Sequence, residues 1–178
     1  NNRSEVQPFF AAPEMLPLDN IDAVVITHAH VDHIGMLPVL FKYGYKGPVY
    51  CTQPTRDLMT LLQMDYIKVA QAEGNDPPYS KSDIQECIKH VVDINWGEKT
   101  DIAPDIKMTM ENAGHILGSS SVYMQIGEGR NEHKLLFSGD IKYEKSWLFD
   151  AATVRFNKVD TLVVESTYGG PQSIQPTR

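Results

Sequence analysis

Three histidines and an aspartate lie within six residues near the start of the chain, in the segment VVITHAHVDHIGMLP. They are His28, His30, Asp32 and His33. His28 and His30 are two residues apart, so an extended backbone would place both imidazoles on the same side. Imidazole and carboxylate groups together suit zinc, and no thiolate is required. The spacing therefore predicts a metal site at this segment.

Two later residues are candidates for the same site. His115 lies in NAGHILGSSS, just after an expected strand, and Asp140 lies in LFSGDI, at the end of another. Ligands commonly gather where strands end, so these two residues and the early cluster supply six donors, enough for two metals. The alternative is that the histidines are solvated in a polar loop or cap a helix. His90 and His133 are expected to have no ligand role.

The first half of the chain is expected to alternate strands and helices. The segment 22–27 reads as a buried strand that ends at the histidine cluster, and 47–51 reads as a second strand. Helices are expected over 34–43 and 54–72, and a third is expected to open with a capping box formed by Ser82 and Gln85. The buried side of the second helix is predicted from its apolar residues, namely Leu58, Leu61, Leu62, Ile67, Val69 and Ala70.

Past Trp96 the apolar period changes to two, which predicts strands. We expect them at 106–110, 122–126, 133–140 and 160–167, with a hairpin turn around Gly127–Asn131. Ser119 to Ser121 could touch a substrate, although small polar residues after a ligand loop more often support the backbone. The whole pattern indicates one α/β layered domain.

Composition limits the possible partners. The chain has 178 residues, with 16 Lys and Arg against 23 Asp and Glu, a formal net charge of −7. This balance argues against a broad basic face for nucleic acid. No apolar stretch is long enough to span a bilayer, and no signal-peptide pattern opens the chain. Cys51 and Cys87 are expected to be buried thiols in a reducing cytoplasm.

The order of the six candidates resembles the metallo-β-lactamase superfamily. The resemblance implies an αββα sandwich with a dinuclear zinc site at one edge of its paired sheets. His at position 30, rather than Glu, is similar to the hydrolytic branch of that superfamily. Carried over, the ligands are His28, His30 and His115 for one zinc, Asp32 and His33 for the other, and Asp140 as the bridge between them.

Such a site would supply a nucleophile at neutral pH. Two zinc ions lower the pKa of a shared water from about 15.7 to near 7. The same ions neutralise charge that builds on a phosphoryl oxygen. An acidic domain can therefore still offer a local positive charge to a phosphodiester.

Three longer stretches are similar to the β-CASP nucleases within the superfamily. They are AGHILGSSSVYMQI, LLFSGDIKYEKSWL and VVESTYGG. In that group the carboxylate matching Glu165 orients a general-acid histidine of an inserted cap domain. Asp32 and Glu165 are accordingly assigned to catalysis. The simpler interpretation of Glu165 is a turn contact at the end of a strand.

The resemblance is to the nucleases of cleavage and polyadenylation specificity factor, and in particular to their archaeal form. It implies a zinc-dependent ribonuclease for RNA 3′-end processing or transcription termination, endonucleolytic and in some members also a 5′→3′ exonuclease. The implied partners are an RNA substrate and, for the full-length protein, a homodimer or a processing complex, with no membrane.

Two departures from the family pattern concern the ends of the chain. The opening NNRSEVQPFF lacks the aspartate motif that precedes the histidine cluster in the family, and no cap domain follows Gly170. We therefore expect residues 1–178 to be a metallo-β-lactamase domain truncated at both ends, without the cap or an RNA-binding module. A final histidine ligand would then be absent, which would weaken the second zinc site.

Other functions remain open at this point. One is a small-molecule thioester or lactone hydrolase of the glyoxalase II kind, against which Glu165 and the Ser-Thr-Tyr-Gly that follows it count. Another is a non-catalytic scaffold paralogue, which six retained ligand candidates oppose. A β-CASP enzyme acting on DNA is also possible, because the residue that separates the two substrates would lie in the cap.

Overall fold

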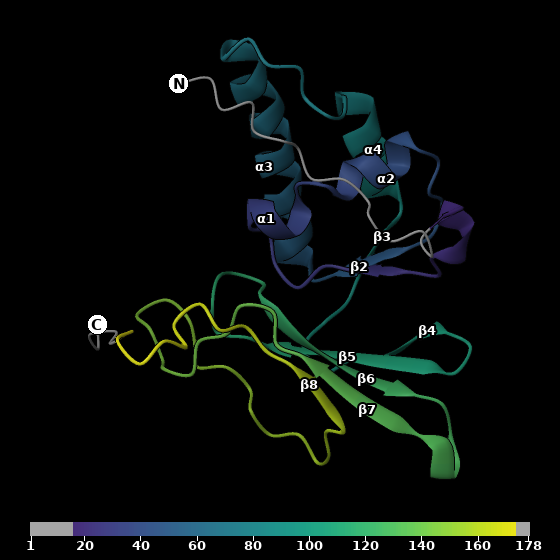
Figure 1. Ribbon diagram of the computed structural model, residues 1–178, viewed down its shortest axis with the longest axis vertical. Helices are drawn as coiled ribbons and strands as arrows, with labels where there is room; N and C mark the ends of the chain where they lie inside the picture. The colour runs from purple at the N-terminus through teal and green to yellow at the C-terminus, as the bar shows by residue number, and fades with distance from the viewer. Residues whose placement is uncertain (1–15, 174–178) are drawn as a thin grey trace.

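The computed structural model describes residues 16–173 and arranges them in layers. Four helices lie on the outer face of a three-stranded sheet, and a five-stranded sheet lies against its other face (Figure 1). In the described part, the strands of each sheet follow chain order, and the helices and the small sheet precede the large sheet in the sequence. None of the helices of residues 16–173 is both long and apolar enough to cross a bilayer.

The small sheet is parallel throughout and has the order β1-β2-β3. Parallel neighbours need crossover connections, and the helices supply them. The elements of this half are β1 (Val24–Val25), α1 (Val31–Ile34), α2 (Leu37–Lys42), β2 (Val49–Cys51), α3 (Gln53–Ala72), α4 (Lys81–Lys89) and β3 (Val91–Asp93), preceded by the 3₁₀ turn η2 (Leu18–Asn20).

The large sheet has the order β4-β5-β6-β7-β8. Its strands are β4 (Lys99–Ala103), β5 (Ile106–Asn112), β6 (Ser120–Ile126), β7 (His133–Phe137) and β8 (Thr161–Val163). The first four pair antiparallel, whereas β8 runs parallel to β7. A 3₁₀ turn, η3 (Gly129–Asn131), joins β6 to β7, which confirms the expected hairpin.

Two apolar clusters hold the layers together. One lies between the sheets and contains Tyr50 from β2, Met108 and Met110 from β5, and Val122 from β6. The other lies between the helices and the small sheet and includes Met59 of α3, which is fully buried. Packing on both faces explains why β1 and β2 are continuously apolar, whereas β3 at the edge is largely exposed.

Three expectations about the helices were wrong in detail. The helix expected over 34–43 is divided into α1 and α2, because Pro38 has no N–H to donate to the carbonyl of Ile34. The capping box of α4 is formed by Ser80 and Asp83, two residues earlier than the predicted Ser82 and Gln85.

The buried side of α3 also differs from the prediction. Leu61 and Val69 are 65% and 48% exposed, while Thr55, Met59 and Gln63 are buried. The face that packs inward therefore carries two polar residues, and apolar character alone did not identify it.

Among the strands, β1, β2, β7 and β8 lie within the predicted segments, β5 ends and β6 begins two residues outside theirs, and β3 and β4 were not predicted. The predicted α/β class, a partial metallo-β-lactamase sandwich, is confirmed, with a single helical layer in the part of the chain that the structure describes. The opening segment without an aspartate motif falls outside the described residues. Cys51 and Cys87 lie in β2 and α4 as expected, and both are buried free thiols.

Candidate metal centre

His28 and His30 follow β1 at the boundary between the two sheets. The main chain is held on both sides there, since Ile26 N donates to Tyr50 O (2.9 Å) and Ser120 N donates to Thr27 O (2.8 Å). The His28 ring is fully buried, and its Nδ1 lies 3.0 Å from the hydroxyl of Thr27. This contact leaves Nε2 of His28 facing the remaining candidates.

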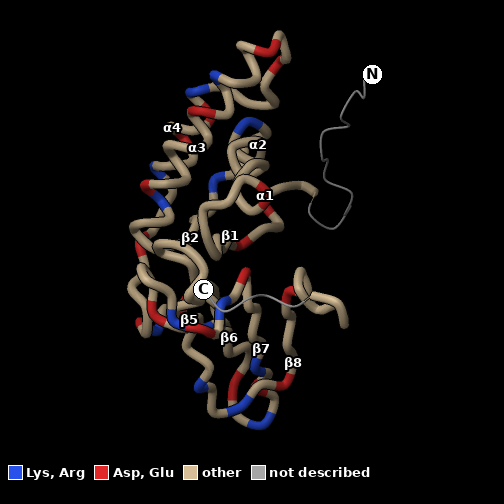
Figure 2. The backbone as a smooth tube through the Cα atoms, turned by 90° about the vertical axis from the view of Figure 1, so that its left-hand side faces the viewer, with Lys and Arg blue, Asp and Glu red and all other residues tan. Residues whose placement is uncertain are grey.

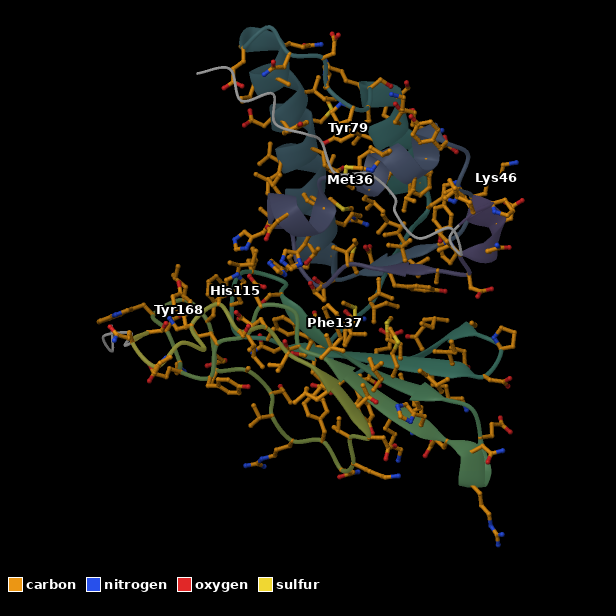
Figure 3. All side chains as sticks on the ribbon, viewed as in Figure 1. Met36, Lys46, Tyr79, His115, Phe137 and Tyr168 are labelled. Carbon is orange, nitrogen blue, oxygen red and sulfur yellow. The ribbon has the colours of Figure 1, made fainter. Side chains whose placement is uncertain are left out.

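His30 and His115 complete a cluster of imidazole nitrogens with His28. Nδ1 of His30 lies 3.1 Å from Nε2 of His28 and 3.1 Å from Nε2 of His115. Figure 3 shows His115 at the edge of the molecule where the helix-bearing half meets the large sheet. The loop that carries His115 joins β5 to β6, which brings a residue 85 positions after His30 into contact with it.

Asp140 lies between this cluster and His33. Its Oδ2 is 3.6 Å from Nε2 of His28 and 3.4 Å from Nε2 of His115. Its other oxygen, Oδ1, is 3.4 Å from Nε2 of His33, and that nitrogen is 3.5 Å from Oδ2 of Asp32. One carboxylate thus turns its two oxygens toward two different groups of side chains.

The donor atoms of the first group fit a tetrahedral metal ion. His28, His30, His115 and Asp140 each offer one donor atom within 4.8 Å of the others. A tetrahedron with metal–nitrogen distances of about 2.0–2.1 Å has edges of about 3.3–3.4 Å. Four of the six separations among these atoms, 3.1 to 3.6 Å, are close to such edges, and the other two are within 4.8 Å. Three imidazoles and a carboxylate are also the donors that zinc prefers.

The second group offers three donors, from Asp32, His33 and Asp140, and is more open. The side chain of Asp32 is 79% exposed, compared with 27% for His33 and 28% for Asp140. Asp32 and His33 lie in α1, where His30 occupies the N-cap position. The turn into this short helix therefore lets the single segment 28–33 supply donors to both groups.

The electrostatics of the cluster favour neutral imidazoles. Burial, reinforced by possible positive charge on His33 and His30, lowers the pKa of His28 to about 3. Burial also lowers the pKa of His115, against the opposing effect of Asp140. A metal ion binds neutral imidazole, so these nitrogens need lose no proton to become ligands near neutral pH.

The His115 loop and the Asp140 segment are fixed by local hydrogen bonds. Ser119 Oγ accepts from the main-chain N–H groups of His115 and Ile116, both at 3.1 Å. Ser121 Oγ donates to Ser138 O (2.9 Å), two residues before Asp140. The interpretation of these serines as backbone support is thereby confirmed for Ser119 and Ser121.

Glu165 does not join the cluster but lies beside it. Its Oε1 accepts from Ile141 N (2.9 Å) and its Oε2 accepts from Thr167 N (3.4 Å). Burial raises the pKa of this carboxyl, but the hydrogen bonds from Ile141 and Thr167 outweigh it, so the net shift is downward. Glu165 is therefore ionised and braces the main chain directly after Asp140, and the expected turn contact is present.

A cleft of about 480 Å³ opens next to Asp140. It is lined by residues 141–144, 164–169 and Ser173, so it contains Glu165 and the Ser-Thr-Tyr-Gly that follows. Tyr168 in this lining is 62% exposed, and Figure 3 shows it on the same side of the molecule as His115.

Thr27, Thr52 and Gln63 contact the site or its supports and were not identified from the sequence. No spacing rule points to them, because their partners are main-chain or ring atoms that only the fold brings near. Thr27 has one weak indication, since it immediately precedes the first histidine of the cluster.

The fold and the arrangement of these residues are those of a metallo-β-lactamase domain, with a cluster of side chains that could hold a metal ion. Residues 3–177 match the profile of a beta-lactamase superfamily domain, and the chain belongs to this superfamily. Membership suggests a metal-dependent hydrolase.

Relatives in several archaea share most of the chain. It is 54% identical over 169 residues to a protein named "Transcription termination factor FttA" from Methanosarcina mazei, covering 95% of this chain and 26% of that relative. Proteins of the same name from Methanothermobacter thermautotrophicus and Pyrococcus abyssi are 53% identical over 171 residues and 48% identical over 182 residues. These matches cover 96% and 100% of this chain but 26% and 28% of those relatives. The resemblance to archaeal β-CASP factors is confirmed, and the chain spans about a quarter of the length of these relatives.

Proposed function

We propose that this chain is the metal-binding domain of a zinc-dependent ribonuclease that acts in transcription termination or RNA 3′-end processing. The observation that carries the proposal is the position of Asp140, whose two oxygens face two groups of ligand candidates. A shared carboxylate of this kind is what a two-metal hydrolytic site requires. The names of the archaeal relatives favour termination as the process.

The residues that would hold the metals follow from the contacts. His28, His30 and His115 would hold one zinc, Asp32 and His33 the other, and Asp140 both. Bound zinc would supply an activated water and positive charge against a phosphodiester at neutral pH. Thr27 holds the His28 ring with Nε2 toward the cluster, and Glu165 holds the segment after Asp140 in place.

Charge distribution supports a local rather than a broad contact with RNA. Lys and Arg are interspersed with Asp and Glu over the helices and both sheets in Figure 2. Attraction for a polyanion would therefore come from the metals and from parts of the whole protein beyond this chain. We propose that a cap domain completes the substrate groove beside the cleft of Glu165, and that the whole protein works in the cytoplasm as a homodimer or in a processing complex.

The test uses the full-length protein and a labelled RNA substrate. Zinc content is measured for the wild type, and cleavage is followed for the wild type, His30→Ala, Asp140→Asn and His133→Ala. His133 is the matched control. It is a histidine at the start of β7, whereas Asp140 follows the end of this strand, and it contacts Thr161 and not the cluster. We expect about two zinc ions per chain, loss of cleavage in the first two variants and unchanged cleavage in His133→Ala.

Three results would contradict the proposal. They are a wild-type protein without zinc, cleavage that survives both His30→Ala and Asp140→Asn, and a folded wild type that hydrolyses a thioester but not RNA. The last result would favour the small-molecule hydrolase, and a zinc-loaded protein without any hydrolysis would favour the scaffold.

A further inference from the structure

Helix α3 contacts two of the three chain segments that carry the ligand candidates. Its first residues meet the His115 loop, and its middle meets the end of α1, which carries Asp32 and His33. These two segments are more than 80 residues apart in the chain. The position of His115 relative to Asp32 and His33 therefore depends in part on a helix that contributes no ligand itself.

The contact with the His115 loop is a carbonyl held by two hydroxyl groups. Gly118 O accepts from Thr52 Oγ1 at 2.7 Å and from Thr55 Oγ1 at 3.1 Å. Both threonines are buried, at 4% and 0% exposure. Thr52 occupies the N-cap position of α3, where a threonine side chain normally accepts from the helix's own N–H groups, yet it makes no such bond. Its hydroxyl contacts the loop carbonyl and the Thr55 hydroxyl (2.9 Å) rather than an N–H group of the helix.

The contact with α1 replaces a bond that proline removes. Ile34 O would accept from the N–H of residue 38 in a continuous helix, but residue 38 is proline. Gln63 Nε2 donates to this carbonyl at 3.0 Å, and Gln63 is 1% exposed. The end of α1, one residue after His33, is thus fastened to the middle of α3.

The hydrogen bonds to the two carbonyls come from one straight helix. Thr55 and Gln63 are eight residues apart, about 12 Å along a helix. Between them α3 contains neither Gly nor Pro, the residues at which helices kink. The separation of the fastened carbonyls is therefore set by helix geometry.

We propose that Thr52, Thr55 and Gln63 are positioning residues, which set the distance between the His115 loop and the end of α1 that carries Asp32 and His33. The proposal rests on the metal site proposed above. It assigns the Thr52–Thr55 pair to the His115 ligand and Gln63 to the Asp32 and His33 ligands. Groups that hydrogen-bond metal ligands commonly change metal affinity about 10- to 100-fold when removed, and this range sets the scale for residues that hold the main chain next to the ligands.

The experiment measures zinc affinity of the full-length protein by competition with a chromogenic chelator. It compares the wild type with Thr52→Val/Thr55→Val, which removes both hydroxyls while nearly preserving shape, and with Thr52→Ser/Thr55→Ser, which keeps them. Thr60→Val is the matched control, because Thr60 on the same helix donates only to Arg56 O within α3. The visible absorption of the Co²⁺-loaded protein reports ligand geometry independently of affinity.

We expect the valine pair to lower the affinity for the tighter zinc at least about 10-fold and to change the Co²⁺ spectrum. The serine pair should restore both, and Thr60→Val should alter neither. Gln63→Met should weaken chiefly the second equivalent of zinc, and this variant decides the matter if the valine pair does not fold.

The outcomes separate the two proposals. A folded wild type that binds no zinc overturns the proposed function and this inference with it. A wild type that binds zinc, together with valine and methionine variants that bind it equally well, overturns the inference alone. Failure of the serine pair to restore affinity also overturns it, because shape rather than the hydroxyls would then be responsible.

Discussion

Gly114, the residue before His115, provides a quantitative test of how tightly the site is built. Its φ is +70°, and an added Cβ would lie 2.6 Å from Lys142 O, 2.7 Å from Ala152 N and 3.0 Å from Asp150 O. All three are main-chain atoms, which cannot rotate away. Gly74 has nearly the same φ, +75°, but nothing within 4 Å of an added Cβ. Gly74→Ala is therefore a matched control for the backbone conformation alone.

The expected cost of each substitution follows from these distances. A left-handed conformation costs a non-glycine residue about 1–2 kcal/mol, and this applies to both variants. Overpacking in a close-packed site adds about 1–3 kcal/mol, and this applies only to Gly114→Ala. We therefore expect losses in the free energy of unfolding of about 1–2 kcal/mol for Gly74→Ala and about 2–5 kcal/mol for Gly114→Ala.

Equilibrium urea unfolding followed by circular dichroism measures both losses, and zinc titration measures the site. Gly114→Ala should also weaken zinc binding, since the segment 142–152 can yield only by displacing the His115 loop. Equal losses for the two variants would refute the reasoning, because the close approach would then have no energetic effect. A large loss in Gly114→Ala with unchanged zinc affinity would refute the link between this contact and the His115 position.

Three further predictions concern the second metal, the core and the thiols. In the full-length protein, Asp140→Asn should keep the fold but lower the zinc content measured by metal analysis, because an amide cannot supply the shared negative charge. A variant that retained two equivalents of zinc would contradict this. Met108→Ala, at a fully buried position between the sheets, should cost about 2–5 kcal/mol in urea unfolding, whereas Leu61→Ala, at an exposed position, should change stability by less than about 0.5 kcal/mol. Burial raises the pKa of Cys51 and of Cys87 to about 12, so iodoacetamide should modify neither thiol in the native protein at about pH 8 and both in denaturant. Because the unfolded thiols lose protons near pH 9 and the folded ones near 12, the stability that they contribute should decline as pH rises through this window, and a stability that rose there would be inconsistent with burial.

The candidate site was largely predictable because its residues are rare types at specific spacing. His28 to His33 stand out by density, and His115 and Asp140 stand out by their position after strands that period-two patterning predicts. Candidate metal ligands can be found from the local sequence, because their own side chains are the groups that would bind the metal. Leu61 and Val69 show the limit of the same approach, since apolar type predicted burial for both and both are exposed.

What the sequence determined by itself is therefore the set of candidate ligands, the superfamily and the alternation of strands and helices. Only the tertiary structure decided which atoms meet, that one carboxylate faces two groups of side chains, and that α3 is hydrogen-bonded to the main chain near His115 and near His33. The physical reason is that histidine and aspartate are recognisable as possible ligands from their side chains alone. A main-chain carbonyl such as that of Gly118 or Ile34 is the same chemical group at every residue, so the sequence does not distinguish it. Such a carbonyl gains a role only when folding brings Thr52, Thr55 or Gln63 within hydrogen-bonding distance of it.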